Sequence, residues 1–162
     1  MIYLKNNLNI DSSNSWHISS NDKYDFVFNQ YPLEVKTTNS KEKLLTLKHN
    51  QIFNNQEKIL AAVFCESNNA GMSVHDLVKI LNKNKQIAQN INFQLKLQQE
   101  LIKINQEDMQ KVKFKLKEIK FFITKDLPTL TNIPENILNF TFQFSCENLK
   151  TISDDIMKKM LL

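Results

Sequence analysis

The chain has 162 residues, a length that suits one domain with a sizeable hydrophobic core. Apolar residues make up 41% of it, which argues against wholesale disorder. One glycine in the whole sequence excludes the glycine-rich loops with which P-loop and dinucleotide-binding proteins hold phosphates. Lysine and arginine exceed aspartate and glutamate by 21 − 17 = 4, an excess that suits a polyanionic partner without identifying one.

The two cysteines, Cys65 and Cys146, stand far apart and have neither metal-binding nor redox spacing. We expect both to be reduced thiols in the core, where free cysteines are usually found. No stretch of the sequence reaches the roughly 18 apolar residues of a membrane span, and the first residues lack the pattern of a signal peptide. The sequence therefore predicts a cytoplasmic protein without a membrane partner.

The N-terminal part of the chain combines polar, turn-forming segments with short runs of strand character. Residues 1–24 contain no glutamate and show no pattern of an amphipathic helix. Period-two alternation on either side of a turn predicts a β-hairpin, and shorter elements are expected to follow it. In chain order these are a strand at 24–28, a turn at 29–32, a strand at 33–38, a short strand within 40–47 and a short helix at 48–53.

The rest of the chain alternates apolar runs of strand length with stretches of helical periodicity. Ser73 is the expected N-cap of the first of these helices. In chain order we expect a strand at 59–65, a loop at 71–73, helices at 74–81 and 85–104, strands at 112–123 and 138–144, and a helix at 153–160. The broad apolar stripe of the helix at 85–104 is typical of a helix that packs on a sheet. The fold class is therefore α/β, bordering on α+β.

Candidate chemistry lies on the hairpin. Alternation places Glu34 and Lys36 on one face of their strand, while Leu33 and Val35 point into the core. Asp25, at the start of the preceding strand, can approach Glu34 across the short hairpin. Two carboxylates and the main-chain carbonyl of Val35 between them make a set of oxygen ligands that suits Mg²⁺ or Mn²⁺. Such an ion would polarise a phosphodiester, and Lys36 would orient the attacking water.

The Glu-x-Lys spacing carries little specificity alone in a lysine-rich chain. It recurs at Glu118 and Lys120, with Asp108 upstream, but Asp108 lies in a helix-prone stretch without a strand-turn-strand context. From the pattern alone, the charged solvent face of an ordinary hairpin is the more frequent explanation of Glu34 and Lys36. A further row of alternating lysines could follow a phosphate backbone, although such a row more often protects an exposed edge strand: Lys111, Lys113, Lys115 and Lys117.

A resemblance to a known family adds to the pattern. It comprises Trp16, the segments Tyr24–Phe28 and Leu33–Thr38, and several later ones: Gln51–Ile52, Gly71–Val78, Phe122–Ile123, Asp126–Pro128 and Ile133–Pro134. These segments, over about residues 16–149, resemble an uncharacterised bacterial family of PD-(D/E)XK proteins associated with restriction-modification and phage-defence gene clusters. The resemblance implies a restriction-endonuclease-like core, a mixed β-sheet flanked by helices, and metal-dependent hydrolysis of DNA. It also implies catalytic roles for Asp25, Glu34 and Lys36 and, more weakly, a substrate-binding role for Gln51. Two further weak candidates for substrate binding do not come from the resemblance: His49, which lies shortly after the Lys36 strand, and Thr37, which follows Lys36.

The chain also departs from this family. Members are longer, and PD-(D/E)XK sites usually gain a further acidic residue from a helix before the first core strand. We therefore expect residues 1–162 to be a single, N-terminally truncated domain that lacks this helix and corresponds to the C-terminal half of a family member. The alternative is a non-catalytic remnant, or a subunit completed by a separately encoded N-terminal half. Loss of the helix would also uncover sheet surface, which favours association into a homo-oligomer. A helical interaction module at residues 85–110 is a further alternative, but it explains neither the hairpin nor the strand at 59–65.

Overall fold

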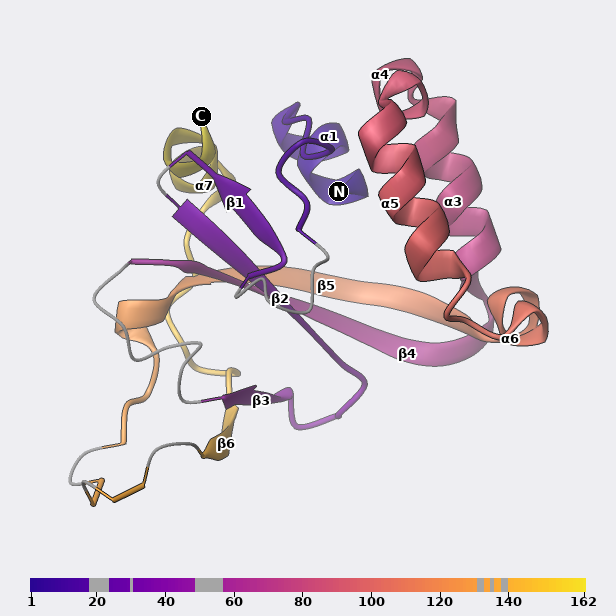
Figure 1. Cartoon of the computed structure of the whole chain (residues 1–162). Coiled ribbons are helices and arrows are strands. Elements are labelled where there is room, and N and C mark those ends of the chain that lie inside the picture. Colours follow the sequence, from indigo (N-terminus) through magenta and orange to yellow (C-terminus); the bar gives the residue numbers. More distant parts are fainter. Residues whose placement is uncertain (18–23, 30, 49–56, 131–132, 135, 138–139) are drawn as a thin grey trace.

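Figure 1 shows a computed structural model of the chain, and the structure describes residues 1–17, 24–29, 31–48, 57–130, 133–134, 136–137 and 140–162. Its centre is a four-stranded sheet in the order β1-β2-β4-β5, with a separate two-stranded sheet of β3 and β6. The strands are β1 (Phe26–Phe28), β2 (Tyr31–Thr38), β3 (Leu44–Lys48), β4 (Ile59–Ser73), β5 (Lys113–Ile123) and β6 (Thr141–Ser145). The helices are α1 (Ile2–Leu8), α3 (Val74–Lys83), α4 (Lys85–Gln89), α5 (Ile91–Leu101), α6 (Gln106–Lys111), the 3-10 helix η1 (Thr124–Asp126) and α7 (Asp154–Leu161).

The central sheet is mixed. β1 pairs with β2 antiparallel, β2 with β4 parallel, and β4 with β5 antiparallel. Asn29 allows the tight connection between β1 and β2, because it adopts a φ of 42°, a left-handed conformation that asparagine tolerates better than most residues. The predicted hairpin and the predicted fold class, a mixed α/β sheet flanked by helices, are confirmed.

Each face of the central sheet is covered by a different layer. On one face, α1 and α7 enclose a core that includes Leu33, Ile59 and Phe121. On the other face lies the β3-β6 sheet (Figure 1). Its leucines and phenylalanines pack against Leu60 and Phe122. Successive residues of β4 point to opposite faces and meet apolar side chains on both. This explains why residues 59–65 form a continuous apolar run, as expected for a strand buried on both sides.

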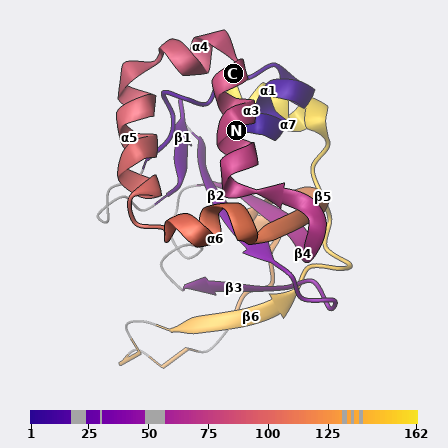
Figure 2. The ribbon, with the colours of Figure 1, turned by 90° about the vertical axis from the view of Figure 1, so that its right-hand side faces the viewer.

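β4 and β5 continue beyond the sheet as a long two-stranded ribbon that carries helices α3 to α6 (Figures 1 and 2). The predicted loop at 71–73 is therefore wrong, since these residues form the end of β4. A Cβ atom on Gly71 would lie 2.3 Å from the main-chain carbon of Phe114, so the close approach of the two strands requires glycine. β5 is an edge strand, which fits the protective interpretation of its alternating lysines.

Ser73 is the N-cap of helix α3, as predicted, and it forms a capping box that was not predicted. Its hydroxyl accepts from the Asp76 main-chain N–H, and the Asp76 carboxylate accepts from the Ser73 main-chain N–H. The single helix predicted at 85–104 is wrong. Asn90 divides it into α4 and α5, because its side chain caps α5 and also donates to Ser13 and Asn14. The buried face of these helices packs on α3, Met1 and Trp16, and not on a sheet as predicted.

The prediction that residues 1–24 contain no helix is wrong, because this segment contains helix α1. Leu4 and Leu8 of this helix are buried under the central sheet, and Tyr3 donates a hydrogen bond of 2.8 Å to Asp154 at the start of α7. The helix contains no acidic residue. It therefore does not supply the additional acidic residue that PD-(D/E)XK sites usually take from a helix before the first core strand.

Both cysteines are free thiols; Cys146 is buried, as expected, whereas Cys65 is half-buried. Burial raises the pKa of each thiol and keeps it in the neutral form. Within the described part of the chain, none of the helices has the length and apolar character needed to cross a membrane.

Candidate active site

The β1-β2 hairpin places Glu34 and Lys36, two of the predicted catalytic residues, on one face of the central sheet. Leu33 and Val35 point into the core under α1 and α7, so the alternating Glu34 and Lys36 point to the opposite face. In the ladder between β2 and β4, Glu34 is the partner of Leu60 and Lys36 the partner of Ala62. The shared face predicted for Glu34 and Lys36 is thus found in the structure.

Asp25 lies immediately before β1 and is fixed at both its main chain and its side chain. Its carbonyl oxygen accepts from the N–H of His17 at 2.9 Å, and its Oδ2 accepts from the N–H of Val35 at 2.7 Å. The second bond holds the carboxylate against the peptide that joins Glu34 to Val35. Among the described residues, none donates a hydrogen bond to Oδ1 of Asp25, which leaves that oxygen available to a cation.

Glu34 is the one acidic residue that is buried in the described part of the chain, with an exposure of 6%. The Lys36 ammonium lies 2.6 Å from its Oε1. Burial raises the pKa of Glu34 above its ordinary value of 4.5; the Asp25 carboxylate acts in the same direction, while Lys36 and Lys58 act against it. A buried carboxyl with a raised pKa and two cationic neighbours is typical of functional sites, although structural ion pairs can have the same properties.

Lys58 is a residue of this region that the sequence analysis missed. It is 0% exposed, and its ammonium lies 5.2 Å from the centroid of the Tyr24 ring, a cation–π distance. Lys58 stands directly before β4 and two residues before Leu60, the ladder partner of Glu34, and its charge lowers the pKa of Glu34. A lysine directly before a strand buried on both sides was the available signal, because such a position has little access to water.

Of the three residues predicted to bind substrate more weakly, Thr37 alone is among the described residues. Thr37 follows Lys36 on β2 and therefore points to the opposite face. His49 and Gln51 lie outside the described residues, as does most of the short helix predicted at 48–53. The predicted use of the Val35 carbonyl as a ligand stays a prediction.

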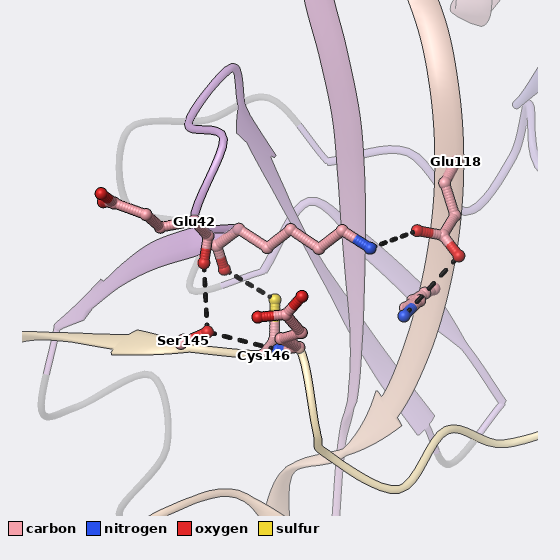
Figure 3. Close-up of polar contacts among 7 residues, drawn as sticks. Glu42, Glu118, Ser145 and Cys146 are labelled. Atoms are coloured by element: carbon pink, nitrogen blue, oxygen red, sulfur yellow. Dashed lines mark hydrogen bonds and ion pairs between the residues drawn. The ribbon is translucent and has the colours of Figure 1, made fainter.

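The second Glu-x-Lys pair lies on the same face of the same sheet, although its sequence context had argued against it. Glu118 is the ladder partner of Phe64 on β4, and Lys120 is the partner of Ala62, the strand position that also pairs with Lys36. Glu118 forms ion pairs with Lys43 at 3.1 Å and with Lys120 at 3.6 Å. Figure 3 shows the Glu118 carboxylate between its two partners.

This Glu118 network is anchored at the start of β3. The Cys146 thiol donates to the carbonyl oxygen of Lys43 at 3.0 Å, and the Ser145 hydroxyl donates to that of Glu42 at 3.1 Å (Figure 3). Lys36, Lys58 and Asp25 influence the pKa of Glu34, whereas Lys43 and Lys120 influence that of Glu118. The two acidic residues therefore belong to separate electrostatic clusters, and Glu118 does not replace the missing third acid.

The carboxylates around Glu34 fit a divalent metal ion that is held by few protein ligands. Asp25 and Glu34 offer carboxylate oxygens, which Mg²⁺ and Mn²⁺ prefer. Groups of three or more histidine, cysteine, aspartate or glutamate side chains that could hold a metal are absent from the described residues. Mg²⁺ is commonly held by one or two carboxylates, with water and substrate phosphate completing its coordination. The residues present fit such a shared site.

Comparison with known proteins identifies the family. Neither a curated protein nor a solved structure matches the chain. A family model with the description "Putative PD-(D/E)XK family member (DUF4420)" matches residues 2–147, which include α1, the hairpin and both sheets. The match supports the resemblance found around the hairpin, but it does not show that the chain is the C-terminal half of a longer member. Because the match covers most of the chain, the protein belongs to this PD-(D/E)XK family.

Proposed function

We propose that the protein is a metal-dependent nuclease that hydrolyses phosphodiester bonds of DNA. The observation that supports this proposal is the hydrogen bond of Asp25 to the β2 strand, on which Glu34 and Lys36 share one face. There, Asp25 is fixed by the Val35 peptide, and Glu34 is buried and paired with Lys36 at 2.6 Å. Membership of a PD-(D/E)XK family supports the same chemistry.

In this proposal Asp25 and Glu34 hold Mg²⁺ or Mn²⁺, with the Val35 carbonyl as a further ligand. When bound, the ion supplies Lewis-acid stabilisation of the phosphodiester and activates water for attack. The Val35 N–H keeps the Asp25 carboxylate in position, so Asp25 does not need to reorganise when the ion arrives.

Lys36 has two tasks in the reaction. Its ammonium has three donors, and it contacts Glu34 at 2.6 Å. In the proposed reaction the remaining donors orient the attacking water and stabilise charge on the phosphate. Its side chain is 27% exposed, so water and substrate can reach it from one side.

The biological setting is part of the proposal. The family resemblance points to restriction-modification and phage-defence systems, in which the substrate is foreign DNA and the enzyme acts in the cytoplasm. No side-chain pattern for reading bases is recognisable in the sequence, so the proposal extends to the DNA backbone and not to a target sequence.

A second candidate is a non-catalytic protein, or a nuclease subunit completed by a partner such as an N-terminal half or a second copy. One observation favours it: two carboxylates, and no third acidic residue, converge on the site within the described part of the chain. A completed site would gain activity on mixing with the missing component, whereas a remnant would stay inactive.

Plasmid cleavage in the presence of Mg²⁺ or Mn²⁺ tests the proposal. We expect Asp25→Asn, Glu34→Gln and Lys36→Met each to reduce cleavage by roughly 100-fold or more, because each removes a group needed in the transition state. Glu66→Gln is the matched control, since Glu66 is an ion-paired carboxylate on the β4-β5 ribbon. Cleavage that persists in all three site variants would assign the activity to a contaminant or to another site.

A further inference from the structure

We propose that Lys96 of helix α5 is a positioning residue for Asp25, because one hydrogen-bonded peptide group connects the two. Lys96 acts through the main chain of Trp16 and His17 and not on the reacting atoms. The inference rests on the proposed function in one respect, namely that a correctly placed Asp25 carboxylate binds a divalent ion. The placement of Asp25 itself follows from contacts of the described residues.

The first argument is the peptide group that joins Trp16 to His17, which is held from both sides. The Lys96 ammonium donates to the carbonyl oxygen of Trp16 at 2.9 Å. On the other side, the N–H of His17 donates to the carbonyl oxygen of Asp25 at 2.9 Å. A charged donor makes a stronger hydrogen bond than a neutral one, and it polarises the peptide that accepts from it. Lys96 therefore strengthens the support of the Asp25 main chain from one peptide away.

The second argument is how this support reaches the Asp25 carboxylate. The segment before Asp25 pairs with the start of β1: the N–H of Val27 donates to the carbonyl oxygen of Ser15 at 2.9 Å, and Trp16 is the bridge partner of Phe26. Asp25 lies at the end of this pairing, and its Oδ2 accepts from the β2 main chain at 2.7 Å. Main chain and carboxylate belong to one residue, so a shift of the segment would move the carboxylate away from β2.

The third argument is that α5 is fixed against the same segment at two further points. The Asn90 side chain donates to the Ser13 hydroxyl at 2.9 Å and to the side-chain oxygen of Asn14 at 2.7 Å. The buried ring of Phe93 lies 5.4 Å from the ring of Trp16. A helix held in this way presents its lysine to the segment in a defined position. The outer surface of α5 takes no part in these contacts.

Amide hydrogen exchange in the metal-free protein provides the first test, since it needs neither metal nor activity. The N–H of Val35 reports on the Asp25 carboxylate, and the N–H of His17 reports on the Asp25 main chain. The amides of β4 that pair with β2 and β5 serve as the internal reference for changes in global stability.

Two substitutions at Lys96 separate its charge from its bulk. Lys96→Met keeps an unbranched side chain and removes the donor, whereas Lys96→Arg keeps a charged donor. Lys103→Met is the matched control, because Lys103 follows α5 and its ammonium pairs with Glu100. We expect Lys96→Met to accelerate exchange at His17 and Val35 by at least about tenfold relative to the reference amides, because a charge-assisted hydrogen bond is lost. Lys96→Arg and Lys103→Met should exchange as the wild type does.

Titration calorimetry with Mn²⁺, in the absence of nucleic acid, provides the second test. We expect Lys96→Met to bind Mn²⁺ about tenfold more weakly than the wild type, the lower end of the range for groups that orient metal ligands. Lys96→Arg should restore the affinity, and Lys103→Met should leave it unchanged.

The two tests together distinguish the outcomes. Exchange at His17 and Val35 that is no faster in Lys96→Met, or faster only in step with the reference amides, would overturn the inference. So would selectively faster exchange with unchanged Mn²⁺ affinity, since Lys96 would then be only structural. If exchange changes as expected but the wild type binds no Mn²⁺, the positioning of Asp25 stands and the proposed metal site fails. If Lys96→Met does not fold, Lys96→Gln, which keeps a polar side chain without the charge, takes its place with the same expectations.

Discussion

Removal of the Lys36 charge should destabilise the metal-free protein more than removal of a comparable charge elsewhere. The Lys36 and Glu34 pair spans 2.6 Å, and its side chains are 27% and 7% exposed. The Lys117 and Glu66 pair spans 2.7 Å, but its side chains are 48% and 42% exposed. The two ion pairs have almost the same length and differ in burial, so Lys36→Met and Lys117→Met form a matched comparison.

The expected magnitudes follow from that difference. An exposed ion pair contributes about 0 to 1 kcal/mol, whereas breaking a buried one costs about 3 to 5 kcal/mol. Lys36 is partly exposed, and Glu34 can relieve an uncompensated charge by binding a proton. We therefore expect about 2 kcal/mol for Lys36→Met, equivalent to a fall of about 4 to 8 °C in melting temperature for a domain of this size. Lys117→Met should cost less than about 0.5 kcal/mol.

The pH dependence supplies a second signature. The pKa of Glu34 is raised in the folded protein, so this carboxyl binds protons more readily there than in the unfolded chain. Its contribution to stability is fully present below the ordinary value of 4.5 and is lost as the pH rises through the folded value. Loss of Lys36 raises that pKa further. The cost of Lys36→Met should therefore be larger at about pH 8 than at about pH 5.

Urea unfolding in EDTA, followed by fluorescence, measures both effects. The single tryptophan, Trp16, reports on folding because its ring lies 5.4 Å from that of Phe93 in the packed interior. Two results would refute the view that Lys36 compensates the charge of Glu34. One is an equal loss of unfolding free energy in the two variants, and the other is a loss for Lys36→Met that does not change with pH.

Three further outcomes are expected. Gly71→Ala should destabilise the protein by roughly 2 kcal/mol or more in thermal melts, because the new Cβ would lie 2.3 Å from the Phe114 main chain; a neutral effect would contradict the strand contact. Ser73→Ala should cost about 1 kcal/mol in urea unfolding, since it removes the capping box of α3, whereas Ser67→Ala should cost little. Lys120→Ala should weaken binding of duplex DNA and lower the slope of log affinity against log salt by about 1, because Lys120 shares a sheet face with Lys36; an unchanged slope would exclude a phosphate contact, and Lys111→Ala is the control.

Local pattern was sufficient to predict the hairpin and the faces of its side chains. Period-two alternation fixed the shared direction of Glu34 and Lys36, and the turn at Asn29 made the approach of Asp25 possible. These features depend on neighbours in sequence, which a single sequence displays directly. The N-cap role of Ser73 was predictable for the same reason.

The features that escaped prediction depend on distant partners. Helix α1 has seven residues and no side-chain cap, so its stability comes from burial of Leu4 and Leu8 against the sheet. The break at Asn90 is tied to Ser13 and Asn14, far away in the chain. Lys58 became a site residue because its strand is covered on both faces and Tyr24 folds over it. None of these contacts leaves a periodic trace in the sequence.

The excursion formed by α3 to α6 has an architectural consequence. It leaves the β4-β5 ribbon at Ser73 and returns at Lys113, and these two residues are ladder partners. Because its two ends meet, the excursion can lengthen, shorten or change its surface during evolution without shifting the register of the strands beside the hairpin. The outer surface of the excursion carries exposed apolar residues of α5 and of the turn that follows it: Ile91, Leu95 and Ile102. These side chains take no part in the hydrophobic core, so substitutions there would leave the core unchanged. Related chains should therefore differ most in the length and composition of this excursion, while the hairpin with Asp25, Glu34 and Lys36 keeps its spacing.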